Sequence, residues 1–400
     1  MKLEIEYINL VDIKPYENNP RKNDKAVEVV AKSIKEFGFL VPIVLDDKNE
    51  IVAGHTRVKA AIKLGMDNVP AVYTEGLTKE QIKAFRIMDN KTNEYASWDD
   101  NLLKEELIEL KNLDFDLDLT GFSELELDKL IDSDTKEVPI PEEVKYNIHI
   151  EDLYELENNG LKHYVYCGDA TNRKDIDNLM KGSKVEMVFT DPPWNVDYGG
   201  NLAAGKYKDR KILNDSMSQE KFLEFLKGSY NTMNYASKEG AMTYVVMSAQ
   251  EWGTNMLALG YNNYHWSSTI IWKKSSLIIS RKDYHTQYEP IWYGWKGDKR
   301  LCALTDRTQS DVWEVDKPTD SKIHPTTKPI ELCTRAIQNS SVKGNKVLDL
   351  FGGSGSTLIA CEQTGRNCYM MELDEDYCSR IIQRWEELTG KTAKKISGNE

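Results

Sequence analysis

The chain has few cysteines and no long apolar run, and these shortages exclude several classes of protein. Its six cysteines lack the paired C-x-x-C spacing of structural metal sites, and its six histidines are equally scattered, so we expect reduced core cysteines and no metal. No apolar run approaches the roughly 18 residues that a membrane-spanning helix needs. The start Met1–Glu6 is unlike a secretory signal, which predicts a cytoplasmic protein without a membrane partner.

Positive charge is also in short supply. The 52 basic residues are outnumbered by 65 acidic ones, a poor balance for a chain that binds nucleic acid. Residues 201–300 depart from it, because basic clusters there alternate with tryptophan and tyrosine, a mix suited to phosphate contacts and base stacking. Taken singly, such a cluster is more often a solvated surface. The basic candidates are Lys206, Lys208, Arg210, Lys211, Lys273, Lys274, Arg281 and Lys282.

The most distinctive segment is 187–194, which reads Met-Val-Phe-Thr-Asp-Pro-Pro-Trp. An apolar strand cannot continue through two prolines, because each lacks the N–H that a sheet needs. Asp191 and the proline carbonyls can accept the two N–H bonds of a planar ring that bears an amino group, and Trp194 can stack on its face. The tetrapeptide alone is equally compatible with a loop that follows a buried strand.

A second segment, residues 346–357, is a short apolar run that opens into a glycine-rich turn before a helical stretch. Glycines let the backbone approach a ligand closely, and the start of the helix offers unpaired N–H groups. The lysine of a phosphate-binding P-loop is missing. A further strand ends in Glu372, about where nucleotide-binding folds place an acid on ribose hydroxyls. The pattern indicates a nucleoside ligand without a phosphate cradle.

These two motifs together resemble those of the DNA amino-methyltransferases, and the resemblance covers most of residues 147–390. Asp191-Pro-Pro-Trp194 precedes Phe351-Gly-Gly-Ser-Gly355, which is the order of the permuted beta class of adenine-N6 and cytosine-N4 methylases. Two further segments fit this class, namely Tyr166-Cys-Gly-Asp169 and His324-Pro-Thr-Thr-Lys-Pro329.

The resemblance implies an enzyme that moves the methyl group of S-adenosyl-L-methionine directly to an amino group of a base in duplex DNA. The base would be turned out of its stack into a pocket formed by Asp191, Pro192, Pro193 and Trp194. Lys328 would approach the cofactor's carboxylate, and Asp349 would organise the glycine turn. The cofactor residues implied are Asp169, Lys328, Asp349, Phe351, Gly352, Gly353, Gly355 and Glu372.

The target base follows from single positions of the first motif. Asp191 is, by resemblance, typical of adenine enzymes, so we expect a site-specific adenine-N6 DNA methyltransferase. Cytosine-N4 methylation is the first alternative, and Trp194 keeps RNA adenine methylation open, since RNA methylases also carry tryptophan there. An alternative of another class is a nucleic-acid-binding module with an inactive methylase domain. The resemblance also allows a homodimer, and it leaves the recognition sequence and any restriction partner open.

The first part of the chain carries a different pair of motifs. Gly38-Phe-Leu-Val-Pro-Ile43 and Gly54-His-Thr-Arg57 resemble the N-terminal domain of the ParB partition-protein and sulfiredoxin superfamily. No cysteine precedes Cys167, which excludes sulfiredoxin chemistry. The second motif opens a helix, so Gly54, His55, Thr56 and Arg57 are candidates for binding a nucleotide or a phosphate. The alternative is an arginine that only closes the first helical turn.

The order of apolar runs predicts the domains. We expect a smaller α+β ParB/sulfiredoxin-like domain over 1–98, an acidic helical spacer and linker over 99–146, and the methyltransferase domain over 147–400, with target recognition at about 201–320. In the last, seven strand-like runs alternate with helical stretches, which predicts an α/β fold with a doubly wound, mostly parallel, Rossmann-like sheet. In such sheets ligands bind beyond the carboxyl ends of the strands, where Asp191, Asp349 and Glu372 fall.

Overall fold

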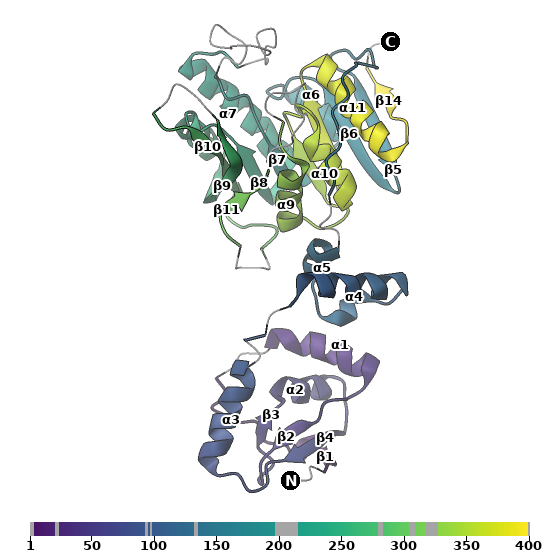
Figure 1. The fold of residues 1–400 in the computed structure, drawn as a ribbon, viewed down its shortest axis with the longest axis vertical. Coiled ribbons are helices and arrows are strands. Elements are labelled where there is room, and N and C mark those ends of the chain that lie inside the picture. The colour runs from purple at the N-terminus through teal and green to yellow at the C-terminus, as the bar shows by residue number, and fades with distance from the viewer. Residues whose placement is uncertain are drawn as a thin grey trace. The chain divides into compact units, whose positions relative to one another are not determined.

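The computed structural model describes residues 4–20, 24–92, 95–96, 98–131, 135–196, 215–278, 283–304, 309–316 and 327–398 (Figure 1). The chain divides into two compact units, Met1–Ile131 and Asp132–Glu400. Within the described ranges, no helix combines the length and the apolar character that crossing a membrane requires.

The smaller unit is built on a four-stranded sheet in the order β1-β4-β2-β3. Only the β2–β4 pair is parallel. Helices α1 and α2 pack together, and the core between helices and sheet includes Ile43, Ile51, Val58 and Val69. The elements are β1 (Glu6–Asn9), η1 (Leu10–Asp12), η2 (Asp24–Ala26), α1 (Val27–Phe37), β2 (Ile43–Leu45), β3 (Ile51–Ala53), α2 (His55–Lys63), β4 (Asn68–Tyr73) and α3 (Lys79–Thr92).

Three further helices of this unit lie among the described residues, namely α4 (Asp100–Asn112), η3 (Leu117–Thr120) and α5 (Glu124–Ile131). Helix α5 begins with a reciprocal cap, because the Glu126 N–H donates to Ser123 Oγ at 3.3 Å while the Ser123 N–H donates to Glu126 Oε2 at 2.7 Å. The pattern Ser-x-x-Glu is typical of such a cap. Helix α1 ends at Gly38, which has a φ of 80°.

Residues 135–146, which the sequence suggested as a linker, lie against the larger unit. The buried Arg384 guanidinium donates from Nε to the Val138 carbonyl at 2.9 Å, and the Lys145 N–H donates to Gln383 Oε1 at 3.0 Å. A buried guanidinium needs acceptors, and this segment supplies them. The three-part division remains a prediction, since the boundary between the compact units falls inside the expected spacer.

The larger unit is built on one sheet, for which the described residues supply ten strands in the order β11-β9-β10-β8-β7-β12-β13-β6-β5-β14. The seven central strands that the sequence suggested are all present, and β5, β11 and β14 extend the edges. Strands β8, β7, β12, β13 and β6 are consecutive in the sheet and run parallel to one another. The strands are β5 (Leu153–Asn158), β6 (Leu161–Cys167), β7 (Val185–Thr190), β8 (Ser237–Val246), β9 (Tyr264–Ile278), β10 (Thr286–Lys296), β11 (Val312–Glu314), β12 (Lys346–Asp349), β13 (Asn367–Glu372) and β14 (Lys394–Ser397).

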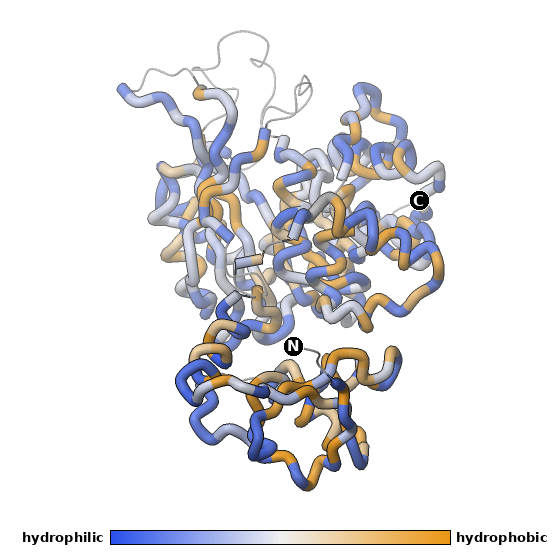
Figure 2. Tube along the Cα trace, turned by 60° about the horizontal axis from the view of Figure 1, so that its bottom comes forward, coloured by the Kyte–Doolittle hydropathy of each residue, from blue (hydrophilic) through white to orange (hydrophobic). Residues whose placement is uncertain are grey.

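Helices cover both faces of this sheet, as a doubly wound fold requires. One hydrophobic cluster joins the sheet to α9, α10 and α11, and a second joins it to α6, α7 and α8. Figure 2 shows hydrophobic and hydrophilic stretches alternating along the chain, as packed layers require. The helices are α6 (Arg173–Met180), α7 (Gln219–Ala236), α8 (Trp252–Tyr261), α9 (Ile330–Ser340), α10 (Ser356–Thr364) and α11 (Glu375–Thr389).

The topology gathers four acidic residues at one edge of the sheet. Strands β7, β12, β13 and β6 are consecutive neighbours and all run the same way. Their carboxyl ends lead to Asp191, Asp349, Glu372 and Asp169 respectively. Residues more than 200 positions apart in the chain therefore meet at one place, the edge where open α/β sheets bind ligands.

Candidate active site

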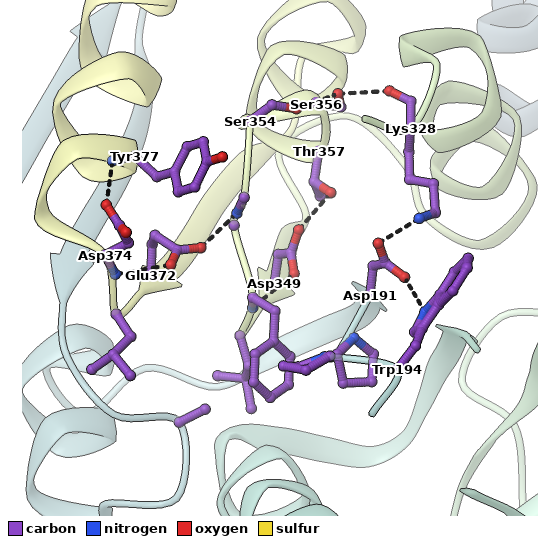
Figure 3. A pocket seen from close by; sticks show the side chains of 18 of the residues that line it. Asp191, Trp194, Lys328, Asp349, Ser354, Ser356, Thr357, Glu372, Asp374 and Tyr377 are labelled. Carbon is purple, nitrogen blue, oxygen red and sulfur yellow. Dashed lines mark hydrogen bonds and ion pairs between the residues drawn. The ribbon is translucent and has the colours of Figure 1, made fainter. Parts of the chain in front are cut away.

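A pocket opens at this edge and contains nearly all of the residues that the sequence motifs singled out (Figure 3). Gly355 does not line the pocket wall. The motif residues that do are Asp169, Asp191, Pro192, Pro193, Trp194, Lys328, Asp349, Phe351, Gly352, Gly353 and Glu372.

Asp349 lies at the centre of the pocket floor and is bonded on both oxygens. Oδ1 accepts hydrogen bonds from Thr190 Oγ1 at 2.8 Å and from the Phe351 N–H at 3.1 Å, and Oδ2 accepts one from Thr357 Oγ1 at 2.7 Å. Burial raises the pKa of Asp349 to about 7, although these three hydrogen bonds oppose the increase. The carboxyl group thus ties β7, the glycine turn and the start of α10 together.

The glycine turn that follows β12 has no room for side chains. A Cβ on Gly352 would lie 2.8 Å from Met370 Cγ, and one on Gly355 would lie 3.1 Å from Ile381 Cγ1. Gly355 also has a φ of 82°, which is strained for any residue with a Cβ, and it directly precedes α10. Its role in the turn is therefore to let the backbone reverse closely over β13 and α11.

Glu372 forms the far wall of the pocket, beside Asp374 and Tyr377 (Figure 3). Its Oε2 accepts the Gly353 N–H at 2.7 Å and its Oε1 accepts the Asp374 N–H at 2.9 Å. Burial raises the pKa of Glu372, while the backbone hydrogen bonds lower it. Each carboxylate oxygen keeps acceptor capacity for a ligand, since an oxygen offers about two lone-pair sites.

Asp169 lies at the carboxyl end of β6 and is held by its own turn. Its Oδ1 accepts hydrogen bonds from the Thr171 N–H at 2.8 Å and from Thr171 Oγ1 at 2.9 Å. The neighbouring Gly168 N–H donates to the Glu372 carbonyl at 2.9 Å, which brings the β6 and β13 ends together. Asp169 therefore lies on the Glu372 side of the pocket.

Asp191 stands at the opposite end, in contact with two donors. Its Oδ1 accepts from Trp194 Nε1 at 3.0 Å and its Oδ2 from Lys328 Nζ at 2.5 Å. Burial raises the pKa of Asp191, and the Lys328 ammonium opposes that increase. The Lys328 ammonium also lies 4.7 Å from the centre of the Trp194 ring. Carboxylate, indole and ammonium thus form one cluster, to which Pro192 and Pro193 add their backbone.

Sequence reasoning missed several residues of the pocket because no motif marks them. Asp215 is buried, and its Oδ1 accepts the N–H groups of Trp194 at 3.1 Å and Val196 at 3.2 Å, which holds the segment after the two prolines. Glu289 in β10 lies 3.6 Å from Lys328 Nζ through its Oε2. Thr357 and Tyr377 also line the pocket. Only Thr357 had a sequence signal, as the last residue of the glycine-rich segment.

The basic residues suggested for nucleic-acid contacts differ in where the structure places them. Lys206, Lys208, Arg210, Lys211, Arg281, Lys282 and the motif residue His324 lie outside the described residues. Lys273 is on the surface, where it pairs with Glu314 at 2.7 Å. Lys274 is a correction, because its side chain is only 2% exposed and forms an ion pair with the buried Glu289. An ammonium enclosed in this way does not reach a phosphate.

In the smaller unit, Gly54, His55, Thr56 and Arg57 line a second hollow. Arg57 donates from one guanidinium nitrogen to the carbonyls of Val41 at 2.8 Å and Pro42 at 3.0 Å, so it holds the segment before β2. Gly54 has a φ of 105°, and a Cβ there would lie 2.9 Å from Ile43 Cγ2. The two motifs of this domain are therefore neighbours in space. The Arg57 contacts reach the segment before β2, and nucleotide or phosphate binding by this motif stays a prediction.

Comparisons with known proteins agree with this architecture. Three family models match the chain, described as DNA methylase over residues 185–384, as ParB-methyltransferase HTH domain over 101–146, and as ParB N-terminal domain over 2–91. The first covers half of the chain. The second names a helix-turn-helix domain where the sequence analysis expected a spacer.

Individual proteins match over parts of the chain. The chain is 24% identical over 245 residues to the type II methyltransferase M.HpaI of Haemophilus parainfluenzae. This alignment covers 54% of this chain and 72% of that protein. It is 46% identical over 81 residues to the ParB-like nuclease domain-containing protein YnaK of Escherichia coli K12. This alignment covers 20% of this chain and 93% of that protein. A solved M1.HpyAVI–SAM complex aligns with 21% identity and a TM-score of 0.41, covering 55% of this chain and 98% of that one.

The strand-end pocket, the two motifs that meet in it and the family match over half of the chain lead to one conclusion. The chain belongs to the DNA methylase family, as an N6/N4-type methyltransferase that uses S-adenosylmethionine, joined to an N-terminal domain of the ParB type.

Proposed function

We propose that this protein methylates the N6 amino group of adenine in duplex DNA in a site-specific manner. The observation that carries the proposal is the cluster at one end of the pocket, where Asp191 is hydrogen-bonded to Trp194 and the two prolines between them also line the pocket. An adenine amino group offers two N–H donors on a flat ring, which matches one carboxylate, one carbonyl and one indole face. The proposal of adenine and not cytosine as the target base rests on Asp191, the first residue of the motif.

The cofactor would occupy the other end of the pocket, between Asp349 and Glu372. Both oxygens of Glu372 are positioned by backbone N–H groups, which suits them to accept the hydroxyls of a ribose. Phe351, Gly352 and Gly353 supply a flat, close wall, with Asp169 on the Glu372 side. Lys328 is the one basic residue among the lining residues, and it pairs with Asp191, so the pocket fits a nucleoside better than a phosphate. When bound, S-adenosylmethionine supplies an electrophilic methyl group.

Asp191 would act by orientation more than by basicity. Its carboxylate pairs with the Lys328 ammonium, which opposes the increase in pKa that burial causes, so the proposal does not require Asp191 to act as a strong base. Accepting the amino hydrogens would direct the nitrogen lone pair at the methyl group, and negative charge nearby would stabilise the nitrogen as it becomes cationic. Trp194 would hold the ring plane. A cysteine nucleophile is not needed for transfer to an amino group.

The test is methyl transfer from labelled S-adenosylmethionine to unmethylated duplex DNA, followed by nucleoside analysis. We expect N6-methyladenosine in the wild-type reaction. Asp191→Ala should lower the rate at least about a hundredfold, as loss of an orienting group in the transition state does. The matched control is Asp298→Ala, an exposed aspartate of the same unit, which should leave the rate unchanged.

Each alternative has its own result in this experiment. If N4-methylcytidine is the product, the target base is cytosine and not adenine. If the methyl group is transferred to RNA but not to DNA, the substrate is RNA. DNA binding without any methyl transfer, with Asp191→Ala changing nothing, would show that the methylase domain is inactive. A homodimer, a cytoplasmic location and nucleotide or phosphate binding at Gly54–Arg57 remain predictions.

A further inference from the structure

A chain of four alternating charges runs from the interior of the sheet to the base-pocket carboxylate. Lys274 in β9 pairs with Glu289 in β10, Glu289 lies 3.6 Å from Lys328 Nζ, and Lys328 lies 2.5 Å from Asp191. Lys274, Glu289 and Lys328 are all buried. Strands β9 and β10, the segment after β7 and the segment before α9 contribute one charge each, and the four charges sum to zero.

Such an arrangement is an inefficient way to stabilise a fold. Removing two charged groups from water costs about as much as their attraction returns, and apolar residues of similar volume often stabilise as well or better. Carboxylate and ammonium groups buried side by side next to a reaction centre are therefore candidates for a functional role. The question is what Glu289 does for Asp191, which it does not touch.

The hydrogen bonds that Asp191 already accepts compete with the contact that a target amino group would make, and Glu289 lies where it can relieve this competition. In the structure both oxygens of Asp191 already accept hydrogen bonds, one from Trp194 Nε1 and one from Lys328 Nζ. A target amino group needs the same carboxylate, and the Lys328 ammonium next to a nitrogen that becomes cationic is unfavourable. Lys328 therefore needs a second carboxylate to which it can turn.

Glu289 offers that second carboxylate. Its Oε1 is engaged by Lys274, whereas its Oε2 is buried, has no hydrogen-bond partner and faces Lys328 Nζ at 3.6 Å. A lysine ammonium is a compact charge with three donors on a flexible stem, so a small rotation of the side chain suffices to close this gap. The backbone of Lys328 stays in place meanwhile, because its carbonyl accepts the Ser356 hydroxyl at 2.8 Å.

We propose that Glu289 is a positioning residue for methyl transfer, which receives the Lys328 ammonium when the target amino group occupies Asp191. Lys274 keeps Glu289 oriented in this role through their ion pair. The inference rests on the proposed function, since it assigns to Asp191 the contact with the target amino group. It adds a residue of β10, outside every motif of the chain, to the groups that determine the rate.

The experiment compares Glu289→Gln with the matched control Glu314→Gln, whose side chain pairs with Lys273 on the surface of the same sheet. Glu289→Gln keeps the shape and the acceptor for Lys274 but loses the charge that attracts Lys328. We expect kcat for DNA methylation to fall at least about tenfold, with the KM for S-adenosylmethionine unchanged because Glu372 and Asp349 are untouched. Glu314→Gln should match the wild type, and Glu289→Asp should recover part of the rate.

The pH profile separates this role from a purely structural one. Burial by itself would lower the pKa of Lys328, but Asp191 and Glu289 together raise it. Without the Glu289 charge, Lys328 should lose its proton at lower pH, so the limb of the kcat profile that reports the Lys328 ammonium should move to lower pH. A merely structural defect would lower kcat equally at every pH at which the protein is folded.

A second variant keeps the test decisive if Glu289→Gln does not fold. Lys274→Met combined with Glu289→Gln removes one charge of each sign, so the buried cluster stays neutral, yet Lys328 still lacks its second carboxylate. We expect this variant to fold and to keep the low kcat. A wild-type kcat in the double variant, or a Glu289→Gln rate within about twofold of the Glu314→Gln rate, would overturn the role of Glu289 but not the proposed function. An inactive wild type, or an active Asp191→Ala, would overturn the proposed function itself.

Discussion

At the scale of single residues, the pocket is a set of carboxyl groups whose different partners give them different properties. Asp349 accepts three hydrogen bonds from its own chain, Asp191 is held by an ammonium and an indole, and Glu372 is held by two backbone N–H groups. Burial raises the pKa of each, and the partners oppose this to different extents. These contacts distinguish the three carboxyl groups, for which we propose an organising role, a base-pocket role and a cofactor role respectively.

The raised pKa of Asp349 predicts a pH dependence of stability. Because its pKa is about 7 in the folded chain against 3.8 ordinarily, the folded state is favoured while the group is neutral, and stability is lost as pH rises from about 4 to about 7. Asp349→Asn removes this loss, so its stability relative to the wild type should rise by up to about 1.4 kcal/mol per pH unit across that window. Urea unfolding at several pH values measures it. A difference independent of pH would contradict the assignment.

Glu372 is expected to affect cofactor binding before it affects anything else. Glu372→Gln keeps one acceptor oxygen but replaces the other by a donor, so the dissociation constant for S-adenosylmethionine should increase roughly tenfold, as for the loss of a charged hydrogen bond. Isothermal titration calorimetry checks this. Glu387→Gln, an exposed glutamate on the neighbouring α11, serves as the control and should bind like the wild type. Equal affinities for both variants would remove Glu372 from the cofactor site.

At the scale of elements, the site depends on the turn between β12 and α10. Its glycines let the chain reverse over Met370 and Ile381, and Asp349 and Glu372 then bond the N–H groups of Phe351 and Gly353. A strand followed by such a turn and a helix is readable in the sequence. The sequence does not show why each position must be glycine, because this depends on which side chains of other elements pack against the turn.

This turn supplies an element-scale prediction with an internal control. Gly355→Ala places a Cβ at a φ of 82° and 3.1 Å from Ile381, so it should destabilise the fold by about 1–2 kcal/mol. Gly253→Ala in α8 meets no atom within 4 Å and has no unusual φ, so it should be neutral or slightly stabilising. Thermal unfolding of the two variants compares them directly. Equal melting temperatures would mean that the turn tolerates side chains.

At the scale of the whole molecule, the chain consists of two units that each have their own hydrophobic core. The segment 135–146 belongs by its contacts to the larger unit, where Val138 is buried and its carbonyl accepts two guanidinium nitrogens of Arg384. The larger unit should therefore fold alone only when this segment is included.

Two fragments test that statement. A fragment of residues 135–400 should fold and bind S-adenosylmethionine. A fragment of residues 147–400 should be less stable by about 2–3 kcal/mol or more, because Arg384 would be left buried without its acceptor. Chemical denaturation of both fragments measures the difference. Similar stabilities would show that the segment is only a linker, as the sequence alone suggested.

The fold class, the strand-end motifs that meet in the pocket and the ParB-type domain could all be predicted from the sequence. Strand ends, proline pairs, glycine turns and caps are local signals, because backbone geometry decides them within a few residues. Even the meeting of Asp191, Asp349 and Glu372 followed from the rule that parallel strands share one ligand edge.

Only the tertiary structure decided which charges face one another. Lys274 and Lys273 are neighbours in a basic cluster, yet one is buried on Glu289 and the other is on the surface, because successive residues of a strand point to opposite faces. The pairing of Lys328 with Asp191 and the position of Glu289 depend on the strand order, in which β8 separates β10 from β7, and on the packing of α9 against β7. No local pattern encodes such distances, since the partners lie between 39 and 137 positions apart in the chain.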